Sequence, residues 1–88
     1  MLGNRTKDWL EFSDKVANHI QEYTIPQYGD RPNDLAEQWK PEDCIANIKR
    51  YAARFGSNSR AGQEKLDLLK IAHYAQLAYL KLEQAEEK

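Results

Sequence analysis

The sequence predicts an all-α fold, a small helical bundle of three main helices and one short helical turn, with a long helix at the C-terminus. Apolar residues recur at spacings of three and four through most of the chain, which is the period of an α-helix. Proline or glycine interrupts this pattern at 24–33 and again at 56–62, and both residue types end helices. With 88 residues the chain is long enough for one core, so we expect a single helical domain over 1–88.

The first main helix is expected at about residues 6–23, with Thr6 as its N-cap. Five apolar side chains fall on one stripe of this helix: Trp9, Phe12, Val16, Ile20 and Tyr23. Such a stripe is typical of a helix that packs one face against a core and leaves the other face in water.

Segment 24–33 is expected to be a loop, because it contains two prolines and Gly29, and these residues favour turns. Asp34 and Glu37 then have the spacing of a capping box, which predicts a short turn of helix through Trp39. The chain must leave the helical conformation after this turn, because a proline follows two residues later.

The second main helix is expected to begin at Pro41 and to end at Gly56. Proline at the first helical position loses no hydrogen bond, and the acidic Glu42 and Asp43 beside it favour the positive end of the helix dipole. The expected buried stripe consists of Ile45, Ile48, Ala52 and Phe55, with Cys44 and Tyr51 on its flank.

The last helix is expected to run from near Gly62 toward Glu86, and it is apolar around most of its circumference. Its narrow polar remainder consists of Asp67, Lys70, Tyr74 and Lys81. A helix of this kind must be surrounded by other elements. We therefore expect a homo-oligomer, most simply a dimer with this helix at the interface; the alternative is a central helix wrapped inside a monomer.

The amino-acid composition of the chain argues against several classes of function. Thirteen Lys and Arg against fourteen Asp and Glu give a net charge of −1, which argues against general nucleic-acid binding. The lone Cys44 has no partner for an intrachain disulfide, and two histidines are too few for a structural zinc site. No apolar run approaches a membrane span. We expect a cytoplasmic protein with no membrane contact and no cofactor, magnesium excepted.

Basic residues are concentrated around one hairpin, because six of them lie between Lys49 and Lys70 against two acids. Arg50 and Arg54 lie one helical turn apart, and Arg60 lies in the loop before the last helix. Guanidinium groups beside a helix N-terminus suit a phosphate or a carboxylate. Alternatively, the two arginines of the helix pair with Asp43 and solvent. Lys49 lies on the edge of the apolar stripe, where it either snorkels to water or points into a pocket.

The last helix contributes further candidates. His73 shares an arc with leucines, so it is either a half-buried, hydrogen-bonded histidine at an interface or a catalytic base. Asp67, Lys70 and Tyr74 form a row with helical spacing. This row either contributes to a ligand site or represents ordinary salt-bridge chemistry along a helix.

Two pairs of carboxylates have the spacing that holds magnesium in helical pyrophosphohydrolases. Glu11 with Asp14, and Glu64 with Asp67, each place two oxygens on one helix face. The first pair lies opposite the apolar stripe of its helix, where it cannot converge with a second helix packed on that stripe. Magnesium is therefore the less favoured alternative, and no phosphate-binding loop or catalytic triad motif is present.

The string RYAARFG at Arg50–Gly56, followed by DLLKIAHY at Asp67–Tyr74, resembles the paired helical motif of a small phage-encoded domain. Most members of that family have no known function, and some are described as nucleotide kinases. The resemblance covers about residues 41–80. It carries over six positions: Tyr51, Arg54, Gly56, Asp67, Lys70 and Tyr74. The chain departs from the motif at 71–73, where the family tends to have one alanine after the lysine and then an aromatic residue.

The string HIQEYTIPQYGD at His19–Asp30 is similar to the entry of helical nucleotide-pyrophosphohydrolase-like proteins of phages and prophages. Both resemblances imply nucleotides. The first functional hypothesis is therefore a protein that binds a nucleotide or another phosphate ligand, with catalysis left open and Tyr28, Tyr51 or Tyr74 stacking on a base. The second is a non-catalytic structural or interaction protein that assembles through its last helix and docks an acidic protein partner on its charged hairpin. The candidate ligand-binding residues are Lys49, Arg50, Tyr51, Arg54, Arg60, Lys70, His73 and Tyr74.

Overall fold

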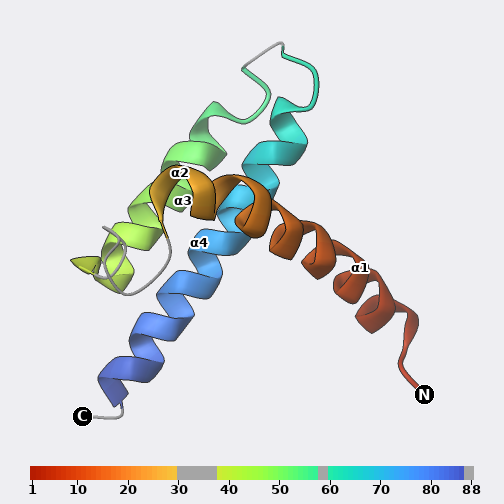
Figure 1. The fold of residues 1–88 in the computed structure, drawn as a ribbon, viewed down its shortest axis with the longest axis horizontal. Helices are drawn as coiled ribbons and strands as arrows, with labels where there is room; N and C mark the ends of the chain where they lie inside the picture. The colour runs from red at the N-terminus through yellow and green to blue at the C-terminus, as the bar shows by residue number, and fades with distance from the viewer. Residues whose placement is uncertain (30–37, 58–59, 87–88) are drawn as a thin grey trace. The chain divides into compact units, whose positions relative to one another are not determined.

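The structure of the protein is a computed structural model, and it describes residues 1–29, 38–57 and 60–86. Every regular element within these ranges is helical, which confirms the predicted all-α fold with its long C-terminal helix (Figure 1). The elements in chain order are α1 (Asn4–His19), η1 (Ile20–Thr24), α2 (Ile25–Tyr28), α3 (Pro41–Arg54) and α4 (Gln63–Glu86). Most of the predicted short turn, which starts at Asp34, lies outside the described residues.

The chain divides into two compact units, Met1–Asp34 and Leu35–Lys88. The first unit contains α1, η1 and α2, and the second contains α3 and α4. The expectation of a single domain over 1–88 stays a prediction.

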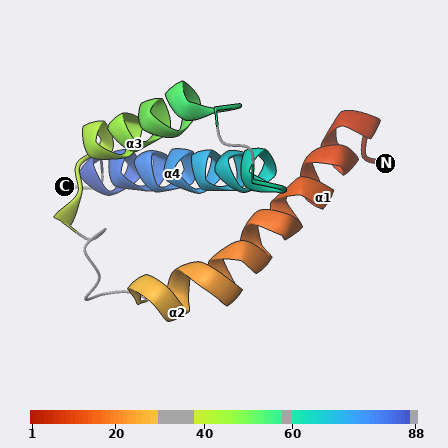
Figure 2. The same ribbon diagram turned by 90° about the horizontal axis from the view of Figure 1, so that it is seen from above.

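In the first unit, one continuous helical path runs from α1 through η1 into α2 (Figure 2). It begins at Asn4 with Gly3 as the N-cap, so the expected start at Thr6 is two residues late. The expected loop from Thr24 is also wrong, because helix continues to Tyr28 and ends at Gly29, whose φ is 93°.

The helix passes Pro26 because of the wider turn before it. In η1 the hydrogen bonds follow a π pattern, and the N–H of Ile25 donates to the carbonyl of Ile20, five residues earlier. In a regular α-helix the ring of Pro26 would clash with the carbonyl four residues before it. The π turn changes the spacing of the carbonyls at this point, and Pro26 then lies in the first turn of α2.

In the second unit, α3 has the boundaries that the sequence predicts. It begins at Pro41, and the N–H of Lys40 donates to Oδ2 of Asp43 over 2.8 Å. At the other end, the carbonyl of Arg54 accepts hydrogen bonds from the N–H and the hydroxyl of Ser57. Gly56 lies between them with a φ of 82°, a conformation that glycine adopts without steric cost.

Helices α3 and α4 lie side by side and antiparallel, as both views show (Figure 1 and Figure 2). The residues of α3 that are buried are Cys44 and Tyr51, and Ile48 between them is half-buried. The expected buried stripe is therefore rotated, because Ile45 and Phe55 are 43% and 46% exposed.

The physical reason for this rotation is that α3 carries two adjacent apolar stripes. Residues 44, 48 and 51 have helical spacing just as residues 45, 48, 52 and 55 do. The stripe with Tyr51 is the one that packs on α4, because the face that α4 presents contains a tyrosine and polar groups. An aromatic ring with a hydroxyl suits such a face better than purely aliphatic side chains do.

The face of α4 that packs on α3 is the narrow polar side of this helix that the sequence predicts. Gln63, Asp67 and Ala78 are buried on α4, and Tyr74 stacks on Tyr51 of α3. Three large apolar side chains of α4 are instead exposed: Leu68, Tyr79 and Leu82. Among the described residues, no helix combines the length and the hydrophobicity that crossing a bilayer requires.

Candidate anion-binding site

Three cationic side chains gather around the ring of Tyr51, which is 8% exposed and lies in the third turn of α3. The guanidinium carbon of Arg50 lies 5.1 Å from the ring centre, that of Arg54 lies 4.6 Å away, and Nζ of Lys70 lies 5.2 Å away. We call these three residues the cation cluster. The negative face of an aromatic ring attracts cations at such distances, so each of the three groups interacts with Tyr51.

The helical spacing of the sequence explains this convergence. Arg50 and Arg54 flank Tyr51 in the sequence by one and three residues, so all three lie near one another on α3. Lys70 comes from α4, which crosses Tyr51 at Tyr74, one turn beyond Lys70. The ring centres of Tyr51 and Tyr74 are 5.9 Å apart, and the two planes meet at 24°.

The stack continues beyond Tyr74. Trp39 lies with its ring centre 5.7 Å from that of Tyr74, and the ring of His73 lies 6.5 Å from it. Tyr51 is thus covered by Tyr74 and by the cation cluster. A buried ring in this position organises the cations, and it leaves no open face for a nucleotide base to stack on.

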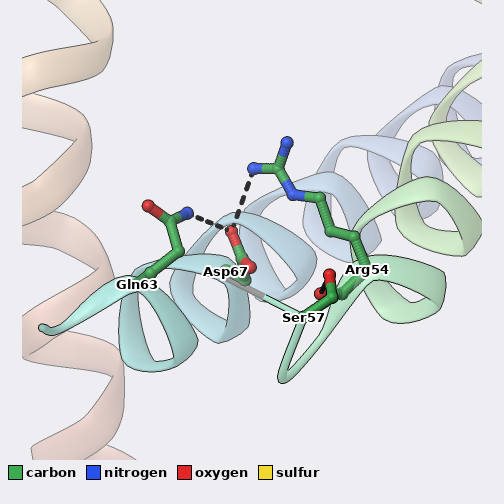
Figure 3. Close-up of polar contacts among 4 residues, drawn as sticks. All are labelled: Arg54, Ser57, Gln63 and Asp67. Atoms are coloured by element: carbon green, nitrogen blue, oxygen red, sulfur yellow. Dashed lines mark hydrogen bonds and ion pairs between the residues drawn. The ribbon is translucent and has the colours of Figure 1, made fainter. Parts of the chain in front are cut away.

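Asp67 is the acidic member of the site, and its side chain is 2% exposed. Its Oδ1 accepts one hydrogen bond from Nε2 of Gln63 at 2.8 Å and a second from a terminal nitrogen of Arg54 at 3.2 Å (Figure 3). Arg54 therefore pairs with Asp67 and not with Asp43, whose carboxylate caps α3. The arrangement ties the end of α3 to the beginning of α4.

The charges of the site do not cancel. Asp67 offsets Arg54, whose side chain is 45% exposed. Within residues 1–29, 38–57 and 60–86, neither Arg50 nor Lys70 has a carboxylate partner. At physiological ionic strength the screening length is about 8 Å, so these cations on one ring repel one another. A bound anion would relieve that repulsion.

The other predicted ligand residues lie outside the cation cluster or beside it. Lys49 is exposed on α3. Arg60 lines a different, open hollow of about 710 Å³, together with the apolar side chains of Phe55 and Leu68. His73 is half-buried beside Tyr74. Of the eight predicted ligand residues, the structure thus places Arg50, Tyr51, Arg54, Lys70 and Tyr74 in one group with His73 beside it.

Gln63 and Trp39 also belong to this group, although the sequence did not predict them there. Gln63 lies four residues before Asp67, and a pair at this spacing shares one helix face. That spacing is the signal that could have found it. Trp39 carries no such signal, because its contact with Tyr74 spans more than thirty residues of sequence.

Cys44 is fully buried on α3, and its surroundings disfavour the reactive thiolate form. Burial raises the pKa of its thiol; the nearby Lys81 ammonium opposes this shift, and Asp43 adds to it. A raised thiol pKa keeps the group protonated at neutral pH, and the thiolate is the reactive form.

The carboxylates do not gather into a metal site within the described part of the chain, where no three His, Cys, Asp or Glu side chains converge. Glu11 and Asp14 are exposed on α1. Glu64 is exposed on α4, whereas Asp67 is buried and accepts hydrogen bonds from Gln63 and Arg54. The oxygens of the second pair therefore have different surroundings despite their helical spacing.

Comparisons with known proteins add no constraint to this geometry. No family model matches the chain, and no curated protein or solved structure matches it. The side chains themselves form a positively charged site with several aromatic rings on the α3–α4 pair.

Proposed function

We propose that this protein binds a small phosphate-bearing ligand, such as a nucleotide, at the cation cluster. The observation that carries the proposal is that Arg50 and Lys70 lie on one buried ring, 5.1 and 5.2 Å from its centre, with no carboxylate opposite them among the described residues. Holding like charges together costs free energy. A phosphate group supplies the acceptors that guanidinium and ammonium groups prefer.

The side chains of the cluster have complementary roles in this proposal. Arg50 is exposed and offers a planar fork of N–H donors that fits two phosphate oxygens. Lys70 adds a compact positive charge from the second helix. Arg54 is held by Asp67 and presents its remaining donors from a fixed position. The ligand thus meets donors from both helices, which are already oriented before it binds.

The resemblance to the phage-encoded domain supports the same site. Five of its six carried-over positions, Tyr51, Arg54, Asp67, Lys70 and Tyr74, take part in the contacts described above. The sixth, Gly56, lies in the turn after α3. We therefore keep a phage or prophage origin, a role in nucleotide metabolism and a cytoplasmic location as parts of this proposal.

Thermal melting with inorganic phosphate and with ATP tests the proposal. We expect both to raise the melting temperature, because a ligand that binds only the folded chain stabilises it by about 2.7 kcal/mol at about 100 times its Kd. Arg50→Gln should weaken binding by about tenfold or more, the equivalent of about 1.4 kcal/mol. The change removes one exposed cation and leaves the buried ring in place.

The matched control is Lys15→Gln, which removes the same charge from an exposed position on α1. It should bind both ligands as the unaltered chain does. If neither ligand raises the melting temperature at millimolar concentration, the phosphate proposal is wrong. Equal weakening by both variants would indicate a general effect of net charge and would also count against the cluster.

A second candidate function is self-assembly through α4. The observation that favours it is that Leu68, Tyr79 and Leu82 are 46%, 66% and 52% exposed. These residues are eleven and three positions apart, so they lie on one side of the helix. An exposed apolar strip of this kind is typical of an interface between protein chains, and in a homodimer the same strip would meet its symmetry copy.

Light scattering at micromolar protein tests this second candidate. We expect a mass of at least twice the chain mass of 10.3 kDa, because the strip is then buried between copies. Leu82→Glu should return the protein to a single-chain mass, whereas Glu83→Gln, on the neighbouring exposed position, should not. A mass of one chain for the unaltered protein would exclude assembly at that concentration.

A further inference from the structure

The net charge of the site is set by a buried carboxylate. The cation cluster contributes three positive charges, and Asp67 contributes one negative charge, which leaves two in excess. Asp67 is fixed in place, because its Oδ1 accepts hydrogen bonds from both Gln63 and Arg54 and its side chain is 2% exposed. It cannot swing away when a ligand arrives, so the excess of two stays with the bound state.

We infer that the site selects a doubly charged phosphate monoester over singly charged anions such as phosphate diesters and sulfate monoesters. This inference rests on the proposed phosphate function and names the class of ligand. A dianion matches the charge of Arg50 and Lys70, the two cluster cations that have no carboxylate partner in the part of the chain that the structure describes. A monoanion leaves one of these cations uncompensated beside the Tyr51 ring.

The two uncompensated cations also suit the geometry of a terminal phosphate. Arg50 lies on α3 and Lys70 on α4, and each lies about 5 Å from the same ring centre. A monoester has three terminal oxygens that share two charges, and in the proposed complex these oxygens accept hydrogen bonds from both groups. A diester has two terminal oxygens that share one charge. The Coulomb energy scales with the product of the charges, and the second charge therefore gains from both cations.

The expected preference is moderate because the site is open to solvent. Arg50 is exposed and Arg54 is 45% exposed, so water weakens every charge interaction there. We expect the dianion to bind about tenfold more tightly than a monoanion of the same shape, which corresponds to about 1.4 kcal/mol.

Calorimetric titration of the full chain with phenyl phosphate and with phenyl sulfate tests the inference. The two compounds have the same shape, and at a pH of about 8 the phosphate is a dianion because its second pKa is about 6, whereas the sulfate carries one charge. A phosphate preference of about tenfold supports the inference. Equal affinities overturn it and leave the proposed function intact. Absence of binding by both compounds, and by inorganic phosphate and ATP, overturns both.

The variant Arg50→Gln distinguishes selectivity based on charge from selectivity based on other properties of the phosphate group. The variant lowers the excess charge from two to one, so phenyl phosphate should lose about half of its free-energy advantage, and the tenfold ratio should fall to about threefold. Arg50 is exposed, which makes this change compatible with folding. Lys15→Gln on α1 should keep the tenfold ratio. A ratio that survives Arg50→Gln unchanged would show that charge count at the cluster does not set the selectivity.

Discussion

Replacing Tyr51 with alanine is expected to lower the free energy of unfolding by about 3 kcal/mol, at the lower end of the range for truncating a buried aromatic side chain. Tyr51 is 8% exposed and stacks on Tyr74. Its ring also lies within 5.2 Å of the cationic groups of Arg50, Arg54 and Lys70. The alanine variant would leave a cavity between the helices and three cations with no ring to hold them.

Urea denaturation followed by circular dichroism measures this loss, and Phe55→Ala is the matched comparison. Phe55 is an aromatic residue at the end of the same helix, but it is 46% exposed, so its loss should cost about 1 kcal/mol. The pair also tests the face of α3 that is buried. If Phe55→Ala costs more than Tyr51→Ala, the stripe that the sequence favoured is the one that packs on α4, and the observed face is wrong.

The elements of the fold that the sequence predicts well are those with local chemical causes. Pro41 lacks an N–H and fits the first turn of a helix, and Gly56 adopts a φ of 82° that other residues avoid. Each of these two residues affects the backbone conformation only within a few positions along the chain. For this reason the start and the end of α3 follow from the sequence, and so does the long helix after Gly62.

The first unit shows where local signals mislead. Pro26 and Gly29 together predict a loop, yet only Gly29 ends the helix. The proline is accommodated because a π turn comes before it, and the N–H of Ile25 reaches back to the carbonyl of Ile20. No residue type marks a π turn in the way that proline marks a helix start, so this feature lies beyond a reading of the sequence.

The candidate site is predictable in its parts but not in its assembly. The sequence identifies Arg50, Arg54 and Lys70 as basic residues near one hairpin. It does not show that Asp67 is buried against them, because the ion pair with Arg54 joins two helices across thirteen residues. A narrow polar strip on an apolar helix suggests a surface that is exposed to water. In this protein the polar strip of α4 is instead the surface that packs on α3.

Replacing Asp67 with alanine is expected to lower the free energy of unfolding by about 2 kcal/mol. The change removes the acceptor of two hydrogen bonds, and the amide of Gln63, which is 9% exposed, is left buried without it. An unsatisfied buried polar group costs about 1–3 kcal/mol. Arg54 adds less to this total, because its side chain is 45% exposed and water can replace part of the lost contact.

Two further variants identify the source of that loss in the same denaturation experiment. Glu64→Ala removes an exposed carboxylate three residues before Asp67 and should cost about 0.5 kcal/mol or less. In a double-mutant cycle, Arg54→Ala and Asp67→Ala should show a coupling of about 0.5–1 kcal/mol that shrinks as salt is added. Additive effects at low salt would mean that Gln63 alone stabilises the buried carboxylate. Arg54 would then act like Arg50 and Lys70, which have no carboxylate partner among the described residues, and all three cations would be open to a ligand.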